Sequence, residues 1–129
     1  RELLDLGALD VTFPQGVTVT TKEFLRDKRD LARRFMAVYF DGLDLFLKNP
    51  RVGKKALAGF TGIKEEKYLD ADYVQYSEKY LNKPMTTQAR MLSIVFDRIP
   101  VSSPEERERI FKGLIDNSVI AEAHGLRGR

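Results

Sequence analysis

The chain carries few of the side chains that perform chemistry in proteins. It has no cysteine, which excludes a disulfide framework, a thiolate zinc site and a cysteine nucleophile. Its one histidine, His124, stands beside Gly125 near the C-terminus, and a histidine can act as a general base. The sequence offers no partner for it. We therefore expect His124 to be exposed and inert, with no catalytic residue, no metal site and no cofactor in the chain.

Two pairs of adjacent carboxylates are the other candidates for acid–base chemistry. Glu65 is followed by Glu66, and Glu105 is followed by Glu106. Adjacent residues on a helix do not face each other, whereas acidic residues at a helix N-terminus interact favourably with the helix dipole. We interpret both pairs as helix N-terminal acids, and a hydrolase that uses two carboxylates stays open as the alternative.

Two further motifs have both a functional and a structural interpretation. The segment Gly59–Gly62 has two glycines but lacks the lysine and the serine or threonine of a nucleotide-binding loop, which favours a helix end. Tyr73, Tyr76 and Tyr80 share one helix face and could stack on the ring of a ligand. Packing on an apolar helix, with the hydroxyl groups at the surface, is the interpretation we favour.

The charges of the chain are nearly balanced. Lys and Arg number 22 and Asp and Glu number 19, which gives a net charge of +3, and the two signs alternate along the chain. A nucleic-acid-binding domain usually has a basic face, so we expect no nucleic-acid partner. The rival hypothesis, a nucleic-acid binder with salt-sensitive affinity, would use the basic residues Arg26, Lys28, Arg29, Arg33 and Arg34.

Length and composition predict one soluble domain with a hydrophobic core. The chain has 129 residues, of which 43% are hydrophobic and 32% charged. No apolar stretch approaches the roughly 20 residues that a membrane-spanning helix needs. The chain begins at Arg1 without an initiator methionine or a signal peptide, and we expect it to be a piece of a longer protein.

The elements that would position these residues are mostly helices. Gly16–Thr20 alternates β-branched residues and predicts a short strand, and Arg1–Leu6 could be the end of another. The strand at Gly16–Thr20 needs a sheet that the rest of the chain does not supply. After it, we expect Thr20 to cap a short helix through its bond with the N–H of Glu23, and Asp27 to cap the next one.

The strongest predicted helix covers Lys28–Lys48. On a wheel of about 100° per residue, its charged residues occupy one sector, and apolar residues fill most of the remaining circumference. An ordinary surface helix has an apolar stripe only about 100° wide. We therefore expect this helix to be buried between other helices and a sheet.

Five shorter helices follow in the prediction. The first covers Arg51–Phe60 and is ended by Thr61 and Gly62, and the second covers Lys64–Leu81 with a break near Asp70–Asp72. The third runs from Thr86 or Thr87 to Ile99, and the fourth begins with Ser103, Pro104 and Glu106. The last is a single turn at Ile120–Ala123, ended by Gly125. The predicted fold class is therefore mainly α, with five or six helices and one or two short N-terminal strands.

Several segments resemble the C-terminal part of one transport family. The residues that carry the resemblance are Gly16–Leu25, Asp30–Tyr39, Gly42–Pro50, Lys54–Leu57, Thr61 and Gly62, with Phe111, Asp116, Asn117 and Val119 near the end. They are similar to the solute-binding proteins of ABC importers for nitrate, taurine, sulfonates or pyrimidine precursors, which have the type II periplasmic binding protein fold. The motifs are packing and capping motifs, so they indicate a family better than a ligand.

The resemblance implies a place for each part of the chain. Such proteins have two α/β lobes around a cleft. Residues 1–15 would be the end of lobe two and the return crossing, and residues 16–129 the C-terminal strand and helices of lobe one. Phe13, Pro14 and Gln15 would lie nearest the cleft mouth and are the expected ligand-binding residues. Most other ligand-contacting residues would lie outside this chain.

Function follows from the same resemblance. It implies a segment of an extracytoplasmic, periplasmic protein that captures a small solute and delivers it to an ABC permease. The resemblance implies no catalysis, although relatives of the pyrimidine-precursor type include enzymes. The alternative, from a different class, is a free-standing helical protein-interaction module. We expect the exposed surface that would face the missing sheet to drive self-association, and a strictly monomeric, well-folded chain would count against the missing sheet.

Overall fold

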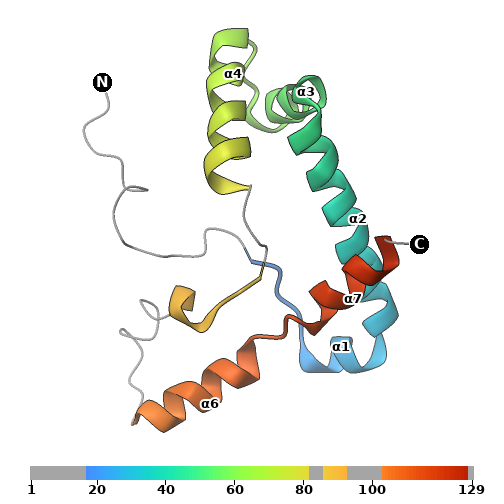
Figure 1. The fold of residues 1–129 in the computed structure, drawn as a ribbon, viewed down its shortest axis with the longest axis vertical. Helices are drawn as coiled ribbons and strands as arrows, with labels where there is room; N and C mark the ends of the chain where they lie inside the picture. Colours follow the sequence, from blue (N-terminus) through green and yellow to red (C-terminus); the bar gives the residue numbers. More distant parts are fainter. Residues whose placement is uncertain (1–16, 82–85, 93–102, 128–129) are drawn as a thin grey trace.

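The computed structural model describes residues 17–81, 86–92 and 103–127, and this part of the chain is helical without a strand. Figure 1 shows the long helix α2 with other helices gathered at its two ends. The mainly α prediction is confirmed at this level. The elements are α1 (Lys22–Asp27), α2 (Arg29–Lys48), α3 (Pro50–Thr61), α4 (Glu66–Val74), the π-helix η2 (Gln75–Tyr80), the 3-10 helix η3 (Ala89–Leu92), α6 (Pro104–Leu114) and α7 (Ser118–Arg127).

The predicted strand at Gly16–Thr20 is wrong for its described part. Residues 17–20 have no regular structure and are exposed, and Gly16 lies outside the described residues, as does Arg1–Leu6. Alternating β-branched residues express only a local preference, whereas a strand forms through backbone bonds to a neighbour. No such neighbour exists among the described residues.

The caps of the first two helices differ from the prediction. Thr21, not Thr20, caps α1, and its hydroxyl accepts from the backbone N–H of Phe24 at 3.1 Å. Asp27 does not cap α2, because it is the last residue of α1 and its carboxylate binds Arg26 at 2.7 Å. Lys28 joins the two helices without a side-chain cap. The N–H of Lys28 instead donates to the carbonyl of Phe24 at 2.7 Å.

The predicted boundaries between α2 and α3 are confirmed. α2 ends at Lys48, and the Asn49 side chain accepts from the N–H of Val52 at 3.3 Å to begin α3. Pro50 occupies the first position of α3, where its missing N–H costs nothing. Gly62 ends the helix with a φ of 76°, a left-handed conformation that glycine adopts without a steric penalty.

The N-terminal half of α2 packs on α7. Met36 and Phe40 of α2 and Val119 and Ala123 of α7 form the buried core between them. Partly buried neighbours complete this core: Leu25, Ala32, Ala37, Leu43 and Ile120. The two helices run in the same direction, because Ser118 at the start of α7 lies near the start of α2 and the end of α7 lies near its middle.

Two arginines join α2 and α7 at the edges of this core. Arg29 of α2 donates to Glu122 at 2.6 Å and to the Ser118 hydroxyl at 2.6 Å. Arg127 of α7 donates to Asp41 and Asp44 of α2, at 2.7 Å each. Gly125 does not end this helix as predicted, because α7 continues to Arg127. These two bonds of Arg127 occur only if the last turn of α7 stays helical.

A second group of helices lies at the C-terminal end of α2. Leu57 of α3 and Leu69 of α4 are buried, and α4 runs through Asp70–Asp72 without the predicted break. Tyr73 packs on Phe46 with ring centroids 5.3 Å apart, and its hydroxyl donates to the carbonyls of Phe46 and Leu47 at 3.1 and 3.0 Å. It thus satisfies carbonyl groups of the last turn of α2.

The C-terminal part contains one confirmed start signal. Ser103 caps α6, with its hydroxyl accepting from the N–H of Glu106 at 3.2 Å, and Pro104 is the first helical residue. Of the helix predicted from Thr86 or Thr87 to Ile99, the described part contains only the short η3, and residues 93–102 lie outside it. The Asn117 side chain bonds both the N–H and the carbonyl of Thr87, at 3.1 and 2.9 Å.

Gly53 supplies a test of the α3–α4 packing. A Cβ added to Gly53 would lie 2.7 Å from Cδ2 of Tyr73, whereas one added to Gly59 on the same helix would meet nothing within 4 Å. We expect Gly53→Ala to lower the free energy of unfolding by about 1–3 kcal/mol through overpacking. Gly59→Ala should raise it by about 0.5–1 kcal/mol, because alanine is the better helix former. Denaturant unfolding followed by circular dichroism measures both, and equal effects would contradict this packing.

Acid should weaken the docking of α7 on α2. Bonds from Lys48 and Arg127 hold the pKa of Asp44 below its ordinary 3.8, and bonds from Ser118 and the charge of Arg29 do the same for Asp116. Groups with a lowered pKa stabilise the folded state above the ordinary pKa and lose that contribution as the pH falls through the folded value. We therefore expect Tm to fall in acid, below pH 3.8.

The matched control for this acid effect is Asp44→Asn. The variant removes one of the titrating groups, so its Tm should fall less steeply below pH 3.8 than that of the unchanged chain. Thermal unfolding followed by circular dichroism across a pH series measures both slopes. If Tm falls equally steeply with pH in both chains, the protonation of Asp44 does not contribute to the acid effect.

Candidate functional site

The ligand-binding residues expected from the sequence are Phe13, Pro14 and Gln15. All three lie outside the described residues, so their role stays a prediction. Among the residues that the structure describes, a site could lie at a cavity, at a cluster of ionisable groups or on exposed apolar surface.

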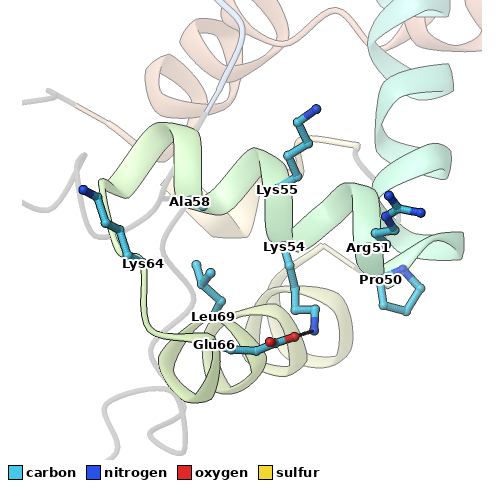
Figure 2. A pocket seen from close by; sticks show the side chains of 8 residues that line it. All are labelled: Pro50, Arg51, Lys54, Lys55, Ala58, Lys64, Glu66 and Leu69. Carbon is cyan, nitrogen blue, oxygen red and sulfur yellow. Dashed lines mark hydrogen bonds and ion pairs between the residues drawn. The ribbon is translucent and has the colours of Figure 1, made fainter.

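A surface hollow of about 660 Å³ lies between α3 and α4 (Figure 2). Half of its lining residues are basic, three are apolar and one is acidic: Arg51, Lys54, Lys55, Lys64, Pro50, Ala58, Leu69 and Glu66. A ligand for such a surface would have to be anionic.

The basic groups of the hollow do not form an anion site. The Lys54 ammonium is already held by Asp70 and Glu66, at 2.8 Å each, and these bonds raise its pKa above the ordinary value. Figure 2 shows the heads of Arg51, Lys55 and Lys64 pointing away from one another. The hollow therefore offers separate charges at its rim and no convergent set of donors.

The candidates for acid–base chemistry have structural contacts instead. His124 is exposed, as expected, but its ring stacks on Phe40 of the core with centroids 4.5 Å apart and an interplanar angle of 12°. Its sequence position gave no sign of this contact, which forms only when α7 packs on α2. Glu105 lies in the first turn of α6, where bonds from its own N–H and from Ser103 lower its pKa.

The two glutamates at the start of α4 also have helix-terminal positions. Glu65 precedes the first helical residue, Glu66, whose carboxylate binds Lys54. The interpretation of Glu66 and of the α6 pair as acids in a first turn is confirmed. Among the described residues, no group of three or more histidines or carboxylates could hold a metal ion. None of the described helices is long and apolar enough to cross a membrane.

The three tyrosines of the predicted face divide into two roles. Tyr73 packs on α2 as expected, but its hydroxyl is hydrogen-bonded to carbonyls of α2 rather than placed at the surface. Tyr76 and Tyr80 face each other edge-on, with ring centroids 5.8 Å apart, and remain exposed. The Tyr80 hydroxyl accepts from the side-chain amide of Gln75 at 3.0 Å. Two tyrosines alone do not enclose a ligand.

The basic residues of the nucleic-acid hypothesis are mostly paired with acids. Arg26 binds Asp27, Arg29 binds Glu122, and both Arg33 and Arg34 bind Asp30. Paired charges largely cancel at a distance, which leaves little net field to attract a phosphate backbone.

The feature that distinguishes this structure is a second apolar face on α2. We name it the outer face and define it by Leu31, Phe35, Val38, Gly42 and Leu45. On the helix wheel these residues lie within about 80° of one another, and the residues packed on α7 are centred about 150° away. Phe35 is 57% exposed and Val38 70% exposed. The surplus of apolar residues that the sequence shows on this helix is thus real, and the described residues cover only one of its two faces.

The outer face is the best candidate for a functional surface. Its residues repeat at intervals of three and four, so they form a continuous stripe along α2 rather than scattered exposed side chains. A stripe of about 14 residues extends for about 20 Å. Contiguous exposed apolar surface marks a place where another surface binds.

Comparison of the chain with models of known protein families, with curated proteins and with solved structures finds no match in any of the three.

Proposed function

We propose that this chain is a segment of an extracytoplasmic solute-binding protein that captures a small solute for an ABC importer. The observation that carries the proposal is the uncovered outer face of α2, which has the form of a helix surface made to lie on a sheet. The motifs at Gly16–Leu25, Asp30–Tyr39 and Gly42–Pro50 support it by their resemblance to this class of transport protein.

The proposal gives the exposed segments of the structure a common cause. In an α/β lobe, helices cover a mostly parallel sheet, and each helix buries one apolar stripe on it. The outer face of α2 would lie on the lobe-one sheet. Val17–Thr20, irregular and exposed here, would join the same sheet as a strand. Both features thus follow from one absent surface.

In this proposal the chain binds and does not catalyse. The parent protein would bind a small anionic or heteroaromatic solute between two lobes, with Phe13, Pro14 and Gln15 near the cleft mouth, and would deliver it to a membrane permease. It would need no cofactor and would work in the periplasm or outside the cytoplasmic membrane.

The second candidate is a free-standing helical module that binds another protein through the outer face. The same exposed stripe favours it, because an amphipathic helix face can lie in a partner's groove as well as on a sheet. The two candidates differ in the size of the natural gene product.

The intact mass of the protein, as its own gene produces it, distinguishes the two candidate functions. We expect a mass well above the 14.8 kDa of this chain, because the proposal places most of both lobes on the same polypeptide. Intact-protein mass spectrometry measures it. A natural product of 14.8 kDa would contradict the transport proposal and leave the interaction module.

Solute binding to that gene product is the direct functional test. A ligand that binds only the folded state at 100 times its Kd adds about 2.7 kcal/mol to the free energy of unfolding, which raises Tm. We expect nitrate, taurine, an alkylsulfonate or a pyrimidine precursor to raise the Tm of the gene product.

The 129-residue chain without the rest of the lobes is the control, and none of the four compounds should raise its Tm. The absence of a Tm shift with the complete gene product for all four compounds would count against this solute class.

A further inference from the structure

We propose that the 129-residue chain forms a two-fold dimer in which two α2 helices pack antiparallel through their outer faces. This goes beyond the proposed function, because it concerns what covers the outer face when no sheet is present. The partner that covers the outer face is a second copy of the same chain. The sizes and charges of the side chains along α2 favour this partner.

The apolar residues of the outer face match their own copies in an antiparallel pair. With the two-fold axis beside Val38, Leu31 of one chain lies seven residues before the axis and meets Leu45 of the other, seven residues after it. Phe35, three residues before the axis, lies near the partner's Gly42, four residues after it. A Cβ placed on Gly42 would meet nothing within 4 Å, so the space above this glycine is open to the ring of a partner's Phe35.

The charges beside the outer face select the antiparallel direction. Arg34, Asp41, Asp30 and Lys48 all lie along one flank of the stripe, and the other flank carries Ala32, Tyr39 and Phe46 instead. A two-fold axis perpendicular to the helices brings like flanks together. Arg34, four residues before Val38, then lies against the partner's Asp41, three residues after it. A parallel pair would place charged flank against uncharged flank.

These charges are free enough to change partners. The Arg34 side chain is 69% exposed and paired with Asp30, and the Asp41 side chain is 64% exposed and paired with Arg127, which also binds Asp44. An exposed pair such as Arg34 with Asp30 contributes little to stability, and Arg127 keeps its bond to Asp44 when Asp41 faces a partner chain, so the exchange has a small cost. Charge complementarity at such a rim fixes orientation more than affinity. The short apolar stripe makes the dimer dissociable rather than permanent.

Single cysteines give a direct test, because the natural chain has none. Val38→Cys lies at the axis and should form a disulfide-linked dimer under mild oxidation. Leu45→Cys lies seven residues from the axis, so its two copies lie about 14 residues apart along the pair. At 1.5 Å per residue this is about 20 Å, beyond the roughly 7 Å that a disulfide can bridge. A mixture of Leu31→Cys and Leu45→Cys chains should cross-link to each other. Phe60→Cys, on α3 and 89% exposed in the natural chain, controls for random collision.

Gly42→Leu separates loss of the dimer from loss of the fold. Leucine would occupy the space for the partner's Phe35, yet it meets no atom of its own chain near its Cβ and favours helix over glycine. We expect at least a tenfold increase in the dimer dissociation constant by sedimentation equilibrium, with helicity unchanged or higher by circular dichroism.

Three results would overturn the proposal: a chain that stays monomeric at every concentration, Leu45→Cys cross-linking to itself as readily as Val38→Cys, or Gly42→Leu dimerising as tightly as the natural chain. The solute-binding proposal is tested separately, by the mass and the Tm shifts of the complete gene product.

Discussion

The burial of one side of α2 against α7 is the interaction on which the rest of the described structure depends. Met36 and Phe40 enter a small core with Val119 and Ala123, and Arg29 and Arg127 fix the edges. Removing a large apolar side chain from such a core costs about 2–5 kcal/mol. Because this core is small, the helix keeps a second apolar face that nothing in the described chain covers, and both proposals about function arise from that surplus.

Local signals predicted the boundaries that local chemistry determines. Asn49, Pro50 and Gly62 start and end α3 through bonds and backbone angles within a few residues, and Ser103 does the same for α6. The cap at Thr21 was misplaced by one position because Thr20 offers the same hydroxyl. Gly125 was misread as a stop because the helix is held by Arg127, whose partners lie more than 80 residues earlier in the chain.

Distant partners explain the remaining differences between prediction and structure. The Tyr73 hydroxyl binds carbonyls of α2, and Arg29 binds Glu122, at separations of 26 and 93 residues, and no window of sequence contains both members. A strand at Gly16–Thr20 likewise requires a second strand to which its backbone can bond. The candidate surface was easier to anticipate, because the width of the apolar sector on Lys28–Lys48 exceeds what one packed face can bury. The sequence does not encode which partner covers it.

The position of α2 between two groups of helices has a consequence for how the chain loses its structure. α7 packs at one part of α2, and α3 with α4 at its C-terminal end, and within the described residues α7 has no comparable contact with α3 or α4 (Figure 1). Among the described residues, cooperativity between the two groups therefore passes mainly through α2. Amide hydrogen exchange would then resolve two opening units of different free energy, with the residues of α2 belonging to both.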